Sequence, residues 1–226
     1  MKRIFVVMAV LAAAALIGAG IAMAGISNTK HNLSNSATPT RTFYSTATAT
    51  GTSEICVFCH TPHNASGTQP LWNRTVNNLG FTVYGTTLAG TTASATVSSG
   101  TLLCFSCHDG VTALNTLSNY PGSSTSVTMN NNQTLLTGFA VLGKDLRNDH
   151  PVGIVYNEGR ASLKTITNIA TGQTTVRVLT ASTLSGQNAV SQVECSSCHD
   201  PHLDTNPSFL RVSNASSALC IACHNK

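Results

Sequence analysis

The cysteines constrain this chain more than any other feature, because all eight fall into four copies of one five-residue pattern. Each copy has two cysteines separated by two residues and a histidine directly after the second cysteine. No cysteine is left over. The copies are motif one (56–60), motif two (104–108), motif three (195–199) and motif four (220–224).

Three kinds of chemistry use paired cysteines. An exported chain with an even number of cysteines can form disulfides, and paired C-x-x-C units can bind zinc. Neither explains the histidine after every pair, since only 8 of the 226 residues are histidine. C-x-x-C-H is the attachment signature of c-type haem. We therefore predict four haem c groups, held covalently by Cys56 and Cys59, Cys104 and Cys107, Cys195 and Cys198, and Cys220 and Cys223.

The spacing within a motif has a mechanical reason. Two thiols three residues apart on a helical turn lie on one side of it, where they can bond to the two vinyl groups along one porphyrin edge. The next residue then stands under the iron and offers its imidazole as the proximal ligand. The predicted proximal ligands are His60, His108, His199 and His224.

The spare histidines equal the vacant iron positions in number. A haem iron takes a second axial ligand, usually His or Met, and the spare histidines are His31, His63, His150 and His202. The one methionine beyond the N-terminal apolar segment is Met129, in an Asn-rich stretch predicted to be a polar loop. We expect four bis-His haems with no iron position for a substrate, and hence an electron-transfer protein rather than an enzyme.

Two spare histidines follow a proximal one at a fixed distance. His63 and His202 each come three residues after a proximal histidine, in the pattern His-x-Pro-His. Three residues span at most about 10 Å, too little to round a porphyrin and return to its opposite face. The proline keeps the segment extended. We therefore expect both spare histidines to bind neighbouring haems. The alternative is a turn that leaves the imidazole exposed.

The other two spare histidines lie in less informative surroundings. His150 precedes Pro151, which favours an extended backbone, and Asp149 could orient a nearby group. His31 lies near the start of the exported chain, where it could bind a haem of its own protomer or of the next one.

The N-terminus predicts export. Lys2 and Arg3 precede an apolar run over 4–21, and Ala22-Met23-Ala24 fits the small-x-small cleavage pattern. We expect residues 1–24 to be a removed signal peptide; the alternative is a retained anchor, since about 20 apolar residues can span a bilayer. The formal charge of +4 includes Lys2 and Arg3, and no basic stripe remains for nucleic acid.

Composition favours a fold built around its cofactors. Only 5% of residues are aromatic, so few large side chains are available to form a core. The 42% of hydrophobic residues argues against a disordered chain. We expect a multihaem cytochrome c fold over 25–226, mostly coil with short helices at the haem motifs, a few strands and the haem stack as its core. Helices are predicted over 101–117 and 213–224, strands over 81–97 and 163–180, and Thr/Ser-rich inserts near 67–100 and 151–193.

The motif skeleton resembles the OmcE-type tetrahaem c-type cytochromes, which polymerise into extracellular cytochrome nanowires. The resemblance rests on the four motifs, the two His-x-Pro-His extensions, the segment Asn-Asp-His-Pro-Val-Gly at 148–153 and the early His31. It does not cover the Thr-rich inserts. It implies a coil wrapped on a continuous bis-His haem stack, and a head-to-tail homopolymer at the cell surface in which His31 binds a haem of the adjacent protomer. Redox partner cytochromes or extracellular acceptors would take the electrons.

Other classes share part of this pattern. A soluble periplasmic tetrahaem shuttle has the same ligand count and differs only in self-association. A membrane-anchored tetrahaem quinol dehydrogenase would retain the N-terminal helix. A multihaem enzyme that reduces nitrite or a similar oxyanion needs an open iron position, which the ligand count disfavours.

Overall fold

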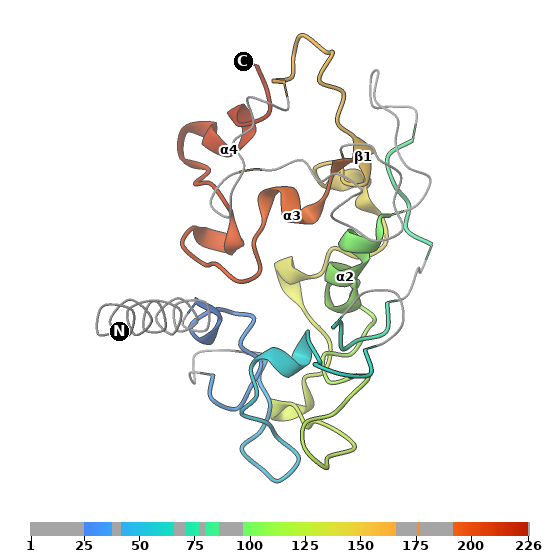
Figure 1. Ribbon diagram of the computed structural model, residues 1–226, viewed down its shortest axis with the longest axis vertical. Helices are drawn as coiled ribbons and strands as arrows, with labels where there is room; N and C mark the ends of the chain where they lie inside the picture. The colour runs from blue at the N-terminus through green and yellow to red at the C-terminus, as the bar shows by residue number, and fades with distance from the viewer. Residues whose placement is uncertain are drawn as a thin grey trace, which may run out of the picture.

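The computed structural model describes residues 25–37, 42–65, 71–76, 80–85, 97–165, 176 and 192–225 (Figure 1). The expected signal peptide, 1–24, lies outside the described residues, as does much of both Thr/Ser-rich inserts. Within the described residues no helix is long and apolar enough to cross a membrane.

Most of the described chain consists of turns and coil, as predicted. The regular elements are short: η1 (Cys56–Phe58), α2 (Ser99–His108), η2 (Asn130–Asn132), η3 (Gly138–Ala140), η4 (Leu146–Asn148), β1 (Ile154–Val155), β2 (Gln192–Val193), α3 (Cys195–Cys198), η7 (Pro207–Phe209), η8 (Ala215–Ser217) and α4 (Ala218–Ile221). Helical turns therefore lie at all four cysteine motifs. β1 and β2 form a two-stranded antiparallel sheet that pairs Ile154 with Val193.

The helix at motif two is shorter than the predicted 101–117. It starts earlier because the Ser98 side chain caps it, accepting a hydrogen bond of 3.2 Å from the Thr101 N–H. It ends at His108 because the Asp109 carboxylate binds the Val111 N–H at 2.9 Å and forms a turn. Gly110 then takes a left-handed φ of 78°, which a helix does not allow.

The other predicted elements also differ from the structure. The helix predicted over 213–224 is limited to η8 and α4, because Ser216 and Ser217 adopt positive φ. Of the strand predicted over 81–97, the described residues form one bridge, between Thr82 and Asp145. Of that over 163–180, they form one bridge, between Leu163 and His224. Residues 86–96, 166–175 and 177–180 of these ranges lie outside the described residues.

The side-chain core is small and divided, which fits the sparse supply of large apolar residues. One cluster surrounds Phe58 of motif one, and the other surrounds Phe105 of motif two. Met129 belongs to the first cluster with only 1% of its surface exposed, so the prediction that it lies in a polar loop is wrong. Its thioether fills space between Leu114, Leu117 and Val127.

The N-terminal segment packs against the end of motif three. Figure 1 shows the blue segment that starts at Gly25 close to the red C-terminal part of the chain. A Cβ atom added at Gly25 would come within 2.6 Å of the His202 carbonyl oxygen, so only glycine allows this approach. His31 continues the contact through its ring nitrogen, 3.3 Å from the Pro201 carbonyl oxygen. The segment is therefore anchored to its own chain.

Candidate haem-binding site

Each motif is arranged around one helical turn. In motifs one, three and four, the histidine N–H donates to the carbonyl of the first cysteine, at 2.8, 3.0 and 2.9 Å. Motif two lies at the end of α2. This turn puts the two cysteines and the histidine on adjacent positions of one helical surface, as attachment of one porphyrin requires.

A second segment holds three of the motifs by the same pair of backbone hydrogen bonds. The carbonyls of Cys59, Cys198 and Cys223 accept from Asn73, Arg211 and Lys164, at 2.9, 2.8 and 2.8 Å. The residue after each proximal histidine donates back to the same segment, as Thr61 does to Leu71 at 2.9 Å. These segments fix the backbone at motifs one, three and four.

Sequence reasoning missed these holding segments, although a signal for two of them exists. Motif one is followed by Pro-Leu-Trp-Asn-Arg at 70–74, and motif three by Pro-Ser-Phe-Leu-Arg at 207–211. Both begin with proline and end with arginine after a pair of large apolar residues. The third segment, 162–164, precedes its motif and shares no such pattern.

Two pairs of histidines face each other at the spacing of axial ligands. The ring centroids of His60 and His202 are 6.1 Å apart, and those of His31 and His108 are 6.2 Å apart. A metal–nitrogen bond of about 2.0 Å and about 1.1 Å from nitrogen to ring centre put the centroids of two axial imidazoles about 6.2 Å apart. The residues present therefore fit a haem iron between the members of each pair.

Hydrogen bonds also select the ring nitrogen that would face the iron. The Nδ1 atoms of His31, His108, His150 and His199 lie 3.3, 2.7, 3.1 and 2.8 Å from backbone carbonyl oxygens. A carbonyl only accepts, so Nδ1 carries the proton in these contacts and Nε2 is left as the ligand atom. Metal-binding histidines are oriented in this way.

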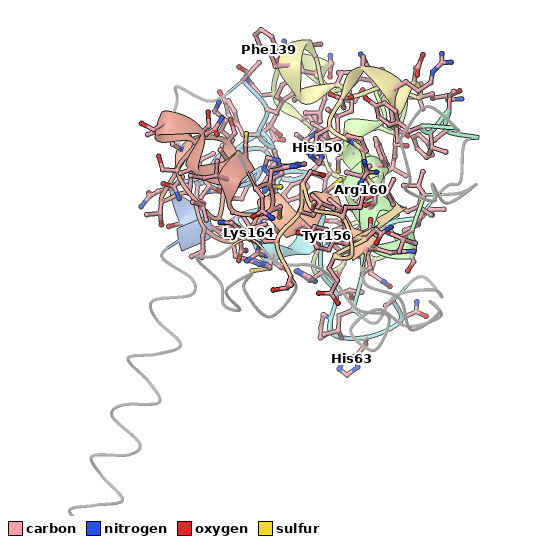
Figure 2. All side chains as sticks on the ribbon, turned by 90° about the horizontal axis from the view of Figure 1, so that it is seen from above. His63, Phe139, His150, Tyr156, Arg160 and Lys164 are labelled. Atoms are coloured by element: carbon pink, nitrogen blue, oxygen red, sulfur yellow. The ribbon has the colours of Figure 1, made fainter. Side chains whose placement is uncertain are left out.

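The pairs show which proximal histidine two of the spare histidines approach. His202 follows His199 of motif three by three residues, and its ring lies beside that of His60 of motif one. His31 faces His108 of the same chain and stacks on Phe209, with centroids 4.2 Å apart. His63 and His150 are exposed, and among the described residues neither ring lies against a proximal histidine. Figure 2 shows His63 projecting from the body of the molecule.

Burial keeps the histidine rings neutral, which is the form that binds iron. Burial, and then the neighbouring His108, lower the pKa of His31 to about 4. Burial likewise lowers the pKa values of His60 and His108. At neutral pH, His31, His60 and His108 can therefore bind a metal without losing a proton.

In this structure the eight cysteines are free thiols. Among the described residues there is no group of three or more His, Cys, Asp or Glu that could hold a single metal ion. The thiols of different motifs are neighbours instead. Burial, followed by the nearby Cys107, raises the pKa of Cys59 to about 12, and a hydrogen bond with Cys195 is the main cause that raises the pKa of Cys104.

The thiols of motifs three and four are neighbours as well. Burial raises the pKa of Cys198 to about 11, and Cys223 is the next cause. Motif two therefore lies beside motif one and motif three, and motif three lies beside motif four.

Two buried charged residues lie beside these motifs and were not singled out from the sequence. The Arg74 side chain is fully buried and donates to the Ser106 carbonyl inside motif two. Glu194, 1% exposed, caps α3 and accepts a hydrogen bond from the Thr101 hydroxyl of α2. Burial raises the pKa of Glu194. Glu194 could have been noticed in the sequence, because it is a charged residue directly before the first cysteine of motif three.

The last part of the chain matches a known family. Residues 188–226, which contain motifs three and four, match the doubled CXXCH motif family. This match indicates a multihaem c-type cytochrome that binds haem covalently and transfers electrons. No curated protein matches the chain.

Proposed function

We propose that this protein transfers electrons through four haem c groups, one at each motif, with two axial histidines on every iron. The observation that carries the proposal is the spacing of His60 from His202 and of His31 from His108, at 6.1 and 6.2 Å. We number the haems 1 to 4 after their motifs. When bound, haem supplies a one-electron carrier whose potential the protein sets through ligands and surroundings.

The chain's own groups hold each porphyrin on two sides. The cysteine thiols would hold each haem through thioether bonds to its vinyl groups, and the motif histidine would bind its iron. His202 and His31 would supply the second imidazole to haems 1 and 2. His63 and His150 remain for haems 3 and 4. Six-coordinate irons leave no position for a substrate, so the proposed protein carries electrons and does not act as an enzyme.

The finer part of the proposal concerns assembly. The N-terminal pattern of 1–24 and the resemblance to OmcE-type cytochromes support export and head-to-tail polymerisation into a conductive extracellular filament. Such a filament needs an open contact that repeats from one copy to the next. An axial imidazole supplied across that contact would fix both the register of the subunits and the spacing of the haems.

Two histidines compete for the role of this joint. His31 is the candidate that the resemblance implies, yet its ring faces His108 of its own chain. His63 is exposed and projects from the molecule (Figure 2), so it can reach a haem of a second copy without leaving a place in its own chain. We favour His63 as the joint on this ground.

Assembly is tested with the full-length precursor, expressed in a host that matures c-type cytochromes. The secreted protein is weighed intact after denaturation and imaged by electron microscopy. We expect a chain that starts at Gly25 and carries four haem masses, and filaments that His63→Ala shortens or dissolves. A monomer at high concentration would favour the periplasmic shuttle, and retention of 1–24 would favour the membrane-anchored quinol dehydrogenase.

A further inference from the structure

Arg74 joins the first two motifs from inside the protein. Its guanidinium donates to the Ser106 carbonyl at 3.1 and 2.9 Å, and Ser106 lies between the cysteines of motif two. The residue before it, Asn73, donates from its backbone to the Cys59 carbonyl of motif one at 2.9 Å. Arg74 therefore lies where the two motifs meet.

The guanidinium is held rigidly and out of water. Its side chain is the largest of the fully buried ones, with 0% of its surface exposed. Besides Ser106 it donates to the carbonyls of Leu114 and Ala113, at 2.7 and 2.6 Å. Guanidinium stays protonated in proteins, so a full positive charge is fixed at this place. In surroundings of low dielectric constant such a charge acts strongly on its neighbours.

The charge lies next to the cysteines that would carry the haems. The guanidinium bonds to the carbonyl of Ser106, which directly precedes Cys107 in motif two, and the residue before Arg74 bonds to the Cys59 carbonyl of motif one. A positive charge at this place would stabilise negative charge added to the haem at either motif.

We propose that Arg74 raises the reduction potentials of haems 1 and 2. Reduction adds one electron to a haem, and a fixed positive charge beside the attachment cysteines stabilises the reduced form over the oxidised form. The effect biases the electron toward the motif one and motif two part of the haem series. The inference rests on the proposed binding of haem c at these motifs, and Arg74 acts on the haems without binding iron.

The test uses the mature, haem-loaded protein and three substitutions at this position. Arg74→Met removes the charge, Arg74→Gln removes it but keeps a hydrogen-bond donor, and Arg74→Lys keeps the charge on a different shape. The control is Arg147→Met, because Arg147 is exposed and pairs with Asp145 at 2.7 Å on the surface. Intact mass first establishes the number of haems in each protein, and a spectroelectrochemical titration then gives the potentials.

We expect both neutral variants to shift the high-potential part of the titration to lower potential, while Arg74→Lys and Arg147→Met keep it near the wild-type position. Neutral variants that carry four haems and titrate like wild type would overturn the proposal. So would equal shifts in Arg74→Lys and Arg74→Met, or haem loss from both neutral variants, since either result makes Arg74 a structural residue. Absence of haem from the wild-type protein would contradict the proposed function instead.

Discussion

The imidazoles of His31 and His108 face each other within one chain, with centroids 6.2 Å apart and planes inclined by 68°. The two rings are arranged edge-on, and their centroid spacing is close to that of two imidazole ligands on one iron. His31 is fixed in this place, because it also stacks on Phe209 and approaches the Pro201 carbonyl. The N-terminal segment therefore brings His31 next to motif two.

This relationship predicts the effect of His31→Ala on a single chain. We expect one of the four irons to become high-spin and to bind carbon monoxide, whether the protein is dilute or concentrated. Spectra across a dilution series measure this, with the exposed neighbour Lys30→Ala as the control. If every iron stays six-coordinate in the variant, His31 is not an axial ligand. An iron that opens only on dilution of the wild type would place the His31 contact between chains.

The pair His60 and His202 predicts that the number of open irons adds up when both distal histidines are removed. His202→Ala should open one further iron, that of haem 1, because its ring faces His60 at 6.1 Å. The double variant His31→Ala with His202→Ala should then show two high-spin irons per chain, quantified by carbon monoxide titration. Asp204→Ala, at an exposed position nearby, is the control. A double variant with only one open iron contradicts the two-site assignment.

How much of this site the sequence predicts depends on how far apart its residues lie along the chain. In motif two, for example, both cysteines and the predicted histidine ligand lie within five residues. Local helical geometry is therefore enough to predict how they are arranged. The short link from His199 to His202 likewise excludes a return to the same haem. Which distal histidine meets which motif depends on long-range packing, such as the contact of Gly25 with His202, and no local pattern encodes it.

The fold shows the same division. Short helices at the motifs were predictable, but the end of α2 was not, because one Asp109 side chain and the left-handed Gly110 outweigh an apolar pattern that continues to Leu117. The burial of Met129 was missed because its Asn neighbours suggested a surface loop.

Asn73 is predicted to be a stabilising residue of motif one. Its buried side chain donates to the carbonyls of Val57 and Asn119 at 2.7 and 2.8 Å, and accepts from the Asn119 N–H at 2.8 Å. Asn73→Ala should lower the free energy of unfolding by about 1–3 kcal/mol for each buried group left unpaired. Denaturant midpoints at equal haem content measure this. The exposed Asn225→Ala should cost far less, and equal losses in both variants would contradict the account.

The buried carboxyl group of Glu194 is expected to make the folding stability depend on pH. Burial raises its pKa, while hydrogen bonds from Ser98 and Thr101 oppose the shift. The folded protein then holds the carboxyl proton more tightly than the unfolded chain, so this contribution is present below the ordinary pKa of about 4.3 and is lost as pH rises through the raised folded value.

Glu194→Gln tests this sign. The variant is neutral at every pH, so the thermal midpoint of wild type minus that of the variant should fall as pH rises from about 4. Glu54→Gln at an exposed position is the control. A difference that is constant with pH, or that grows in favour of wild type, would show that burial does not control this carboxyl.

The central claim is that four bis-His haems carry electrons in this chain, and quantitative electron paramagnetic resonance of the fully oxidised mature protein tests it most directly. The account predicts low-spin ferric signals that integrate to four spins per chain, one for each C-x-x-C-H motif, with no high-spin component. Fewer than four spins, or a high-spin iron in the intact wild-type protein, would contradict it.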